Sequence, residues 1–285
     1  MNLPLKTTDI RLVWTTDIHL NFLNPAQIHR FCKELLSENP DLIVVTGDLS
    51  EAPLLSNHLL SMEKHLEPIP LFFVCGNHDY YNGSIHTIRD TLKNGYTYPE
   101  VDKNLGKLTA GTWWLGSSGY IPVTKTSALI GHDGWYDGLY ADYFKSRIDM
   151  SDYYIIRELT GGPFRRLAKI QELATASADY IEAEMRKAFA DGFKVVYVAT
   201  HVPPFRENAV YKDKISDDHW MPHFSSKIMG DRLIKVMKEF PDKTCMTLCG
   251  HSHGNAYHKP LPNLECRTGE AEYRYPAIND IFIIE

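Results

Sequence analysis

Five short polar clusters in the sequence contain the residue types that bind metal ions or transfer protons. Each cluster directly follows an apolar run, so each is expected where a β-strand ends. Aspartate, asparagine and histidine suit borderline divalent ions such as Mn, Fe and Zn better than Ca or Mg. In chain order the clusters are Asp17-Ile18-His19, Gly47-Asp48, Cys75-Gly76-Asn77-His78-Asp79, His201 and Gly250-His251-Ser252-His253.

The clusters offer seven potential metal ligands, namely Asp17, His19, Asp48, Asn77, His201, His251 and His253. Seven ligands are too many for one tetrahedral zinc ion, but they suit two metals that share a carboxylate. Two divalent transition-metal ions, Mn, Fe or Zn, are therefore the predicted cofactors. Such a pair, roughly 3.5 to 4 Å apart, holds phosphoryl oxygens and lowers the pKa of a bridging water, which suits displacement at a phosphate ester.

The apolar runs before the clusters predict the strands that position them. These runs span residues 11–15, 42–45, 71–74, 194–199 and 244–249. Apolar residues at helical spacing predict helices over residues 25–36, 53–66 and 85–92, and Asn24 followed by Pro25 is typical of a helix start. Three successive strand-helix units favour a mostly parallel sheet that is covered on both faces.

The middle of the chain follows a different pattern. Residues 107–123 are rich in Trp, Thr, Tyr and Gly, which indicates antiparallel strands. Residues 165–190 predict the longest helix, closed by Gly192. The segment at about 135–165 has no clear pattern, and we interpret it as a cap or lid within a single domain of residues 1–285. A helix over 227–240 and short strands over 255–258, 265–268 and 280–284 complete the prediction.

Composition argues against several classes of protein. The net charge of -6 comes without a basic run, so the chain lacks the footprint of a protein that tracks a nucleic-acid backbone. The five cysteines are widely spaced, which indicates reduced and buried thiols. Residues 1–10 lack the apolar stretch of a signal peptide, and no run of about eighteen apolar residues predicts a membrane span. We therefore expect a cytoplasmic protein.

The five clusters, in this order, resemble the signature blocks of the calcineurin-like metallophosphoesterase superfamily. They extend from Asp17 to His253, so the resemblance covers most of the chain. It implies a four-layer α/β/β/α sandwich, in which two mixed sheets are flanked by helices. It also implies a dimetal site at the carboxyl ends of the strands.

The resemblance implies a role for each residue of the clusters. Asp17, His19 and His253 would hold the first metal, Asn77, His201 and His251 the second, and Asp48 would bridge them. His78 would protonate or hydrogen-bond the leaving-group oxygen, a role that suits imidazole near neutral pH. The superfamily often orients this histidine with an acid three residues after the bridging aspartate, where this chain has Glu51. Asp79 completes the predicted catalytic group as an orienting or turn-stabilising carboxylate that does not bind metal.

Ala52 and Cys75 distinguish this chain from one branch of the superfamily. Protein serine/threonine phosphatases have arginines beside the bridging aspartate and before the Gly-Asn-His block, and these guanidinium groups grip phosphate. With alanine and cysteine there, the chain looks more like the phosphodiesterase, nuclease and small-molecule phosphatase branches.

The predicted function is hydrolysis of a phosphodiester or another small-molecule phosphate ester by a metallophosphoesterase. A metal-bound hydroxide would attack phosphorus while His78 assists the leaving group. One alternative is a nuclease, which would need a basic track for the nucleic-acid backbone. Another is a non-catalytic protein-binding scaffold on the same fold, although such members tend to lose ligands that this chain retains. The expected partner is a small phosphate ester, and no association with a membrane is expected. The sequence does not predict the oligomeric state.

Polar residues outside the clusters have two explanations. His132, Asp133 and Trp135 either support the site or form a packed turn, and Tyr80, Tyr81 and Asn82 either line the pocket or pack. The remaining residues of interest are expected to be structural or exposed rather than ligands, namely His29, His58, His65, His86, Arg165, Arg166, His219 and His223.

Overall fold

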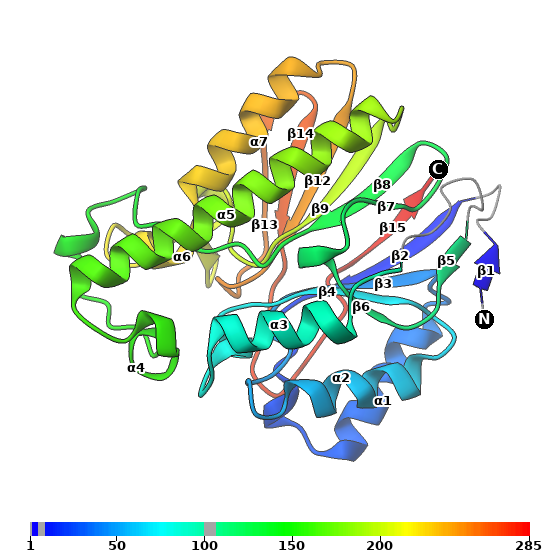
Figure 1. Ribbon diagram of the computed structural model, residues 1–285, viewed down its shortest axis with the longest axis horizontal. Helices are drawn as coiled ribbons and strands as arrows, with labels where there is room; N and C mark the ends of the chain where they lie inside the picture. Colours follow the sequence, from blue (N-terminus) through cyan, green and yellow to red (C-terminus); the bar gives the residue numbers. More distant parts are fainter. Residues whose placement is uncertain (1, 5–8, 100–106) are drawn as a thin grey trace.

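Two β-sheets face each other at the centre of the protein, and helices cover the outer face of each sheet (Figure 1). The computed structural model describes residues 2–4, 9–99 and 107–285. The predicted α/β/β/α sandwich of two mixed sheets is confirmed. Part of residues 1–10, where we expected no signal peptide, lies outside the described residues.

The first sheet has the strand order β15-β2-β3-β4-β6, and only the edge strand β15 is antiparallel to its neighbour. The strands are β2 (Ile10–Thr15), β3 (Leu42–Thr46), β4 (Leu71–Val74), β6 (Thr112–Trp114) and β15 (Asp280–Ile284). The helices packed on this sheet are α1 (Pro25–Ser37), α2 (Leu55–Leu66) and α3 (Ile85–Gly95). Helix α1 begins as predicted, because Asn24 and Gln27 form a capping box before and after Pro25.

The second sheet has the strand order β13-β14-β12-β9-β8-β7. Its four central strands are parallel, and the edge strands β13 and β7 are antiparallel to their neighbours. The strands are β7 (Ile121–Pro122), β8 (Ser127–Gly131), β9 (Val195–Ala199), β12 (Thr244–Cys249), β13 (Ala256–Leu261) and β14 (Leu264–Thr268). Helices α5 (Pro163–Ala190) and α7 (Lys227–Glu239) cover its outer face.

The inner faces of the two sheets share a buried apolar core. Leu12, Val44 and Phe72 of the first sheet belong to the same cluster as Leu129 and Leu248 of the second. Side chains alternate along a strand, so the residues between them turn outward and pack against the helices. Each central strand is therefore buried on both faces, which explains why the sequence shows continuous apolar runs.

The expected mostly parallel sheet that is covered on both faces is present as the first sheet, and its inner face is covered by the second sheet. A run of apolar residues indicates that a strand is buried, but it does not indicate which element covers the strand. The expectation of antiparallel strands over residues 107–123 was wrong in part, because β6 in this stretch is parallel to β4. Strands β5 (Lys107–Thr109) and β7 are antiparallel to their partners, as expected.

Before α5 begins at Pro163, the stretch predicted as a cap or lid contains only short helical turns. These are η4 (Tyr143–Lys145), α4 (Asp152–Ile155) and η5 (Arg157–Leu159), and Ile156 forms an isolated bridge with Gly83. A lid function stays a prediction. The other short elements are β1 (Asn2–Pro4), η1 (Leu20–Phe22), η2 (His78–Tyr80), η3 (Leu115–Ser117), η6 (Arg206–Asn208), β10 (Val210–Tyr211), β11 (Lys214–Ile215) and α6 (Met221–Phe224).

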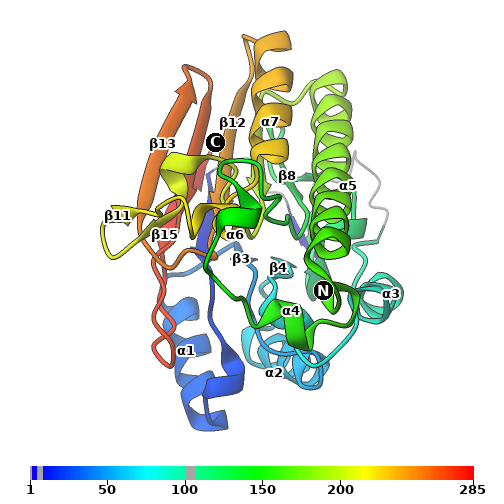
Figure 2. The same cartoon turned by 90° about the vertical axis from the view of Figure 1, so that its left-hand side faces the viewer.

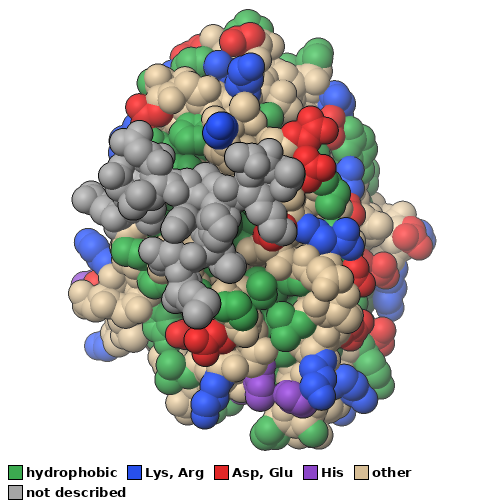
Figure 3. Space-filling view, turned by 90° about the vertical axis from the view of Figure 1, so that its right-hand side faces the viewer, with side chains coloured by type: hydrophobic (Ala, Val, Ile, Leu, Met, Phe, Trp, Pro, Cys, Tyr) green, Lys and Arg blue, Asp and Glu red, His purple; other side chains and the backbone are tan. Residues whose placement is uncertain are grey.

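The parallel strands of both sheets point their carboxyl ends toward the side of the molecule on which α4 and α6 lie (Figure 2). The opposite end is shown in Figure 3, where acidic, basic and hydrophobic side chains are interspersed over the coloured part of the surface. Within the described residues, no helix combines the length and apolar character needed to span a membrane.

Candidate metal centre

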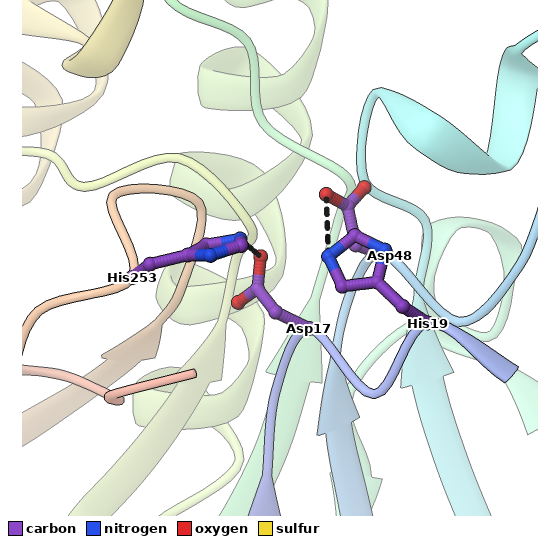
Figure 4. Close-up of side chains that lie close together, drawn as sticks. All are labelled: Asp17, His19, Asp48 and His253. Carbon is purple, nitrogen blue, oxygen red and sulfur yellow. Dashed lines mark ion pairs between the residues drawn. The ribbon is translucent and has the colours of Figure 1, made fainter. Parts of the chain in front are cut away.

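The loops that follow β2, β3, β4, β9 and β12 bring the five polar clusters together where both sheets end. Parallel strands deliver their carboxyl ends to the same edge, so loops from neighbouring strands meet there. The ligand atoms of Asp17, His19, Asp48 and His253 lie within 4.8 Å of one another (Figure 4). His253 Nε2 is 3.3 Å from Asp17 Oδ1, and His19 Nε2 is 3.9 Å from Asp48 Oδ2.

The other predicted ligands gather beside the second oxygen of Asp48. His201 Nε2 is 3.5 Å from Asp48 Oδ1 and 3.2 Å from Asn77 Oδ1. The ring centroids of His201 and His251 are 4.9 Å apart. Asp48 therefore has one oxygen near His19 and the other near His201, which is the position a bridging ligand requires.

Several residues at this centre have a left-handed backbone conformation, which residues other than glycine rarely adopt. Five of the seven predicted ligands have positive φ: Asp17 at 50°, His19 at 42°, Asp48 at 52°, His251 at 69° and His253 at 59°. Each such residue costs on the order of 1 kcal/mol or more, and such residues concentrate at functional sites. The strain turns the side chains from successive loops toward one point.

Glycines in the motifs provide the room for this convergence. A Cβ on Gly76 would lie 2.1 Å from Asp48 Oδ1 and 2.6 Å from His201 Nε2. A Cβ on Gly250 would lie 2.1 Å from Asp17 Oδ2, and one on Gly47 would meet the His201 ring at 2.4 Å. The carboxylates and imidazoles thus occupy the space that side chains at these positions would fill.

Hydrogen bonds hold two of the imidazoles in the tautomers that a metal requires. His201 Nδ1 is 2.9 Å from the carbonyl of Thr46, and His251 Nε2 is 2.9 Å from the carbonyl of His223. A carbonyl only accepts, so these nitrogens carry the proton and the other ring nitrogen keeps its lone pair. Both ring nitrogens of His19 are buried without a hydrogen-bond partner, which is unusual unless a ligand binds there.

The protonation states also suit a cation. Burial lowers the pKa of His19 and of His251 to about 3, so both imidazoles are neutral at pH 7. Burial raises the pKa of Asp48, and the carboxylates of Asp17 and Asp79 raise it further. Burial alone would raise the pKa of Asp17, but the hydrogen bond and charge of His253 lower it below its usual range. Crowded carboxylates with neutral imidazoles fit divalent transition metals, and the seven residues would hold two such ions.

His78 lies beside the ligands at the open edge of the centre. Its Nε2 is 3.9 Å from Asp48 Oδ2, its side chain is 17% exposed, and its ring stacks on Tyr81 with centroids 4.1 Å apart. Burial and the imidazoles of His19 and His201 lower the pKa of His78 well below its usual value. A substrate that reaches Asp48 would therefore also meet this ring.

The two predicted catalytic carboxylates have different surroundings. Asp79 is buried and accepts hydrogen bonds from the backbone N–H of Ser50 at 2.7 Å and of Gly76 at 2.8 Å. It therefore ties the loop after β3 to the loop after β4. Glu51 accepts hydrogen bonds from Asn21 at 3.2 Å and Asn82 at 3.1 Å, and its orienting role toward His78 stays a prediction.

Residues 10–255 match the family model of the calcineurin-like phosphoesterases, which includes all five clusters. The chain belongs to this family. An uncharacterized metallophosphoesterase of Campylobacter jejuni is 26% identical over 156 residues, 53% of this chain and 38% of the relative. A transmembrane protein with a metallophosphoesterase domain from Danio rerio is 31% identical over 88 residues, 29% of this chain and 20% of the relative. The chain thus spans well under half the length of these relatives.

A dimetal phosphatase from Danio rerio has the same fold as this chain. The two structures superpose with a TM-score of 0.57 at 11% sequence identity, over 92% of this chain and 88% of that one. At this identity the similarity shows the two-sheet sandwich alone.

The sequence did not identify two side chains at the candidate metal centre. Asp152, in the stretch predicted as a lid, is buried and 2.9 Å from the amide nitrogen of Asn77. Tyr273, in the connection from β14 to β15, has its ring centroid 4.5 Å from that of His19 and 5.1 Å from that of His253. Neither residue lies in a motif or follows a strand, so no local pattern marked them.

Asp133 supports the loop that carries Asn77 and His78. Its carboxylate accepts hydrogen bonds from the backbone N–H of Cys75 and the indole of Trp114, both at 3.0 Å, and it pairs with Arg89 at 2.9 Å. Asp133 therefore supports the site, which was one of the two explanations considered for this turn. His132 and Trp135 are buried, and Trp135 packs on Tyr80 with ring centroids 6.0 Å apart.

Other residues that we considered have partners of their own. His29 Nδ1 faces His65 Nδ1 at 3.3 Å, His58 bonds to Ser50, and His86 pairs with Asp90. The ring of His223 bonds to Ser146 and Tyr153, in line with the expectation that it is not a ligand. Arg166 is partly exposed, and its guanidinium lies 4.0 Å from the centroid of the Tyr153 ring, in line with a structural residue.

Gly76→Ala should disrupt the centre because its new Cβ would collide with Asp48 and His201. We expect Mn²⁺ affinity, measured by calorimetry on the purified protein, to fall by about 10-fold or more. Gly95→Ala is the matched control, since nothing lies within 4 Å of its added Cβ. Wild-type affinity in Gly76→Ala would contradict the geometry described above.

Proposed function

We propose that this protein is a dimetal-dependent phosphoesterase that hydrolyses a phosphodiester or another small-molecule phosphate ester. The observation that carries the proposal is the placement of Asp48, whose two oxygens face imidazoles of two different ligand groups. Membership of the calcineurin-like phosphoesterase family supports this chemistry. Two bound ions, which we expect to be Mn, Fe or Zn, would supply the Lewis acidity that polarises phosphoryl oxygens and activates water.

His78 is the residue that we assign to the leaving group. Its backbone N–H donates to Asp48 Oδ1 at 2.9 Å, which links the position of the ring to the bridging carboxylate. Stacking on Tyr81 then sets the plane of the imidazole. From this position the N–H of the neutral ring donates a hydrogen bond to the departing oxygen.

Aromatic side chains at the open edge of the centre support a small organic substrate. The rings of Tyr273 and Phe22 meet edge to face with centroids 5.3 Å apart, and both residues are more than 40% exposed. The Tyr273 ring is also 6.2 Å from that of His78. An exposed aromatic pair beside the leaving-group histidine suits a planar or apolar group on the ester.

The charges around the centre support a small ester over a nucleic acid. The groups that most strongly affect the pKa of Asp17 and of Asp48 are imidazoles and carboxylates, in a chain of net charge -6. A nuclease would instead be expected to present cationic side chains along the path of the backbone. The scaffold alternative is disfavoured because all seven predicted ligands and His78 are present.

The cysteines support a cytoplasmic location as part of the proposal. All five, Cys32, Cys75, Cys245, Cys249 and Cys266, are free and buried. Free thiols are typical of a reducing compartment, where disulfides rarely persist.

His78→Gln should lower kcat most for esters with poor leaving groups. We expect a loss of about 10²- to 10⁴-fold on an alkyl or phenyl phosphodiester. The loss on bis(4-nitrophenyl) phosphate should be much smaller, because nitrophenolate departs without a proton. Steady-state kinetics of the Mn²⁺-loaded protein measure both, with His86→Gln on the surface of α3 as the control. Equal losses on all esters would argue against an acid role.

Asp48→Asn and His253→Ala should differ in their metal content. Asp48 lies next to both ligand groups, so Asp48→Asn should weaken both metal positions. His253 lies next to Asp17, so His253→Ala should weaken mainly one. Metal analysis after equilibration with Mn²⁺ should find two ions in the wild type, about one in His253→Ala and fewer in Asp48→Asn. A wild type that binds no transition metal would refute the proposed function.

Tyr273→Ala should change substrate preference. An aromatic contact contributes about 0.5–1.5 kcal/mol, so KM for esters with aromatic groups should rise by about 2- to 10-fold. KM for a methyl ester should change less. Tyr275→Ala is the control, because Tyr275 lies in the same loop and is 69% exposed. The same change in KM for both kinds of ester would show that Tyr273 does not select the substrate.

A further inference from the structure

The stretch 135–165 contributes buried polar side chains beside the ligands predicted for the second metal. Tyr136, Asp152 and Tyr153 are each at most 3% exposed, although the stretch contains only short helical turns. Burying a carboxylate and two phenols is costly unless their polar atoms are bonded. Their hydrogen bonds connect them, directly or through His223, to Asn77 and His251. These are the two residues predicted to hold the second metal together with His201.

Asp152 accepts three hydrogen bonds. Its Oδ1 accepts from Asn77 Nδ2 at 2.9 Å and from the Tyr81 hydroxyl at 2.7 Å, and its Oδ2 accepts from the Tyr136 hydroxyl at 2.8 Å. A side-chain amide has a donor end and an acceptor end of almost the same shape, so its orientation depends on its partners. The carboxylate of Asp152 can only accept, so the amide nitrogen of Asn77 faces it. The amide oxygen of Asn77 is then directed to the other end, 3.2 Å from His201 Nε2.

The same stretch also supports His251 through His223. The carbonyl of His223 accepts from His251 Nε2 at 2.9 Å and thereby sets its tautomer. The ring of His223 is held on both sides by residues of the stretch, with Tyr153 at 2.5 Å from Nδ1 and Ser146 at 2.8 Å from Nε2. Two ligands of the second group thus depend on residues 146–153.

The first group of ligands has different supports. Asp17 accepts from the Thr16 hydroxyl at 2.6 Å and from the backbone N–H of His251 at 3.1 Å. The backbone of Thr16 is held by Asn279 at 2.9 Å, next to β15. These contacts come from the ends of strands, so removing the acceptor at Asp152 should leave this group in place.

We propose that the stretch 135–165 positions the ligands of the second metal, and that Asp152 does so by fixing the amide of Asn77 with its oxygen toward that metal. This inference rests on the proposed dimetal function and assigns Asp152 as a positioning residue. Asp152 would act through Asn77, to which it is bonded, and it is not itself one of the predicted ligands. The ligands of the two metal positions are therefore supported by different parts of the chain. A substitution of Asp152 should weaken metal binding at the second position only.

Asp137 provides a matched control in the same stretch. It is also a fully buried aspartate, and it accepts from the backbone N–H of Ile228 at 2.7 Å and of Leu139 at 2.9 Å. The bond from Ile228 attaches the stretch to the start of α7, and neither bond involves a predicted ligand. Asp137→Asn therefore tests the loss of a buried carboxylate without a change at Asn77.

The experiment measures Mn²⁺ binding to the full chain by calorimetry and the spin coupling of the Mn²⁺ pair by electron paramagnetic resonance. Asp152→Leu should retain one ion at wild-type affinity, bind the second about 10- to 100-fold more weakly, and lose the coupled signal at limiting Mn²⁺. Asp152→Ala removes the same acceptor without adding bulk and serves if the leucine variant does not fold. Asp152→Asn restores an acceptor oxygen and should recover part of the affinity.

Asp137→Asn should melt at a lower temperature while it keeps two ions and the coupled signal. The inference is overturned if Asp152→Ala or Asp152→Leu binds two ions with wild-type affinity. It is also overturned if Asp137→Asn weakens the second ion as much as they do. A wild type without two ions would refute the proposed function itself, so the two failures are distinct.

Discussion

The centre of this protein depends on the burial of two carboxylates, Asp17 and Asp48, among imidazoles and other carboxylates. Asp17 and Asp48 are each 1% exposed, and the groups that act on them are imidazoles and other carboxylates. Taking such charges out of water is costly, and bound cations would offset the cost. The left-handed backbone at Asp48 and the open space at Gly76 serve this arrangement, because both bring the carboxylate close to His201.

The interface between the two sheets fixes the dimensions of the centre. Asp17, Asp48 and Asn77 follow strands of the first sheet, whereas His201 and His251 follow strands of the second. The distance between the ligands that follow the first sheet and those that follow the second is therefore set by the packing of core residues such as Phe72 and Leu248 between the sheets. Protein interiors are packed as densely as crystals, so this core holds the ligands with little freedom.

Sequence reasoning succeeded where the information was local. Each cluster follows its strand within a few residues, so the pattern predicted both the strands and the position of the predicted ligands. It failed where the information was long-range. The pairing of β6 with β4, the bond from Asp152 to Asn77 and the ion pair of Arg89 with Asp133 each join distant parts of the chain. The apolar and polar pattern around each residue does not indicate its distant partner, so these contacts could not be predicted from the sequence.

The two halves of the centre also differ in the stability of their supports. The first is held by the ends of β2, β12 and β15, which belong to sheets with extensive pairing. The second depends on short turns whose order comes largely from side-chain hydrogen bonds, such as those of Asp152 and His223. Elements of this kind open at lower free energy than core strands. Because linkage is reciprocal, an ion in the second position would order the stretch 135–165 to the same extent that this stretch strengthens its binding.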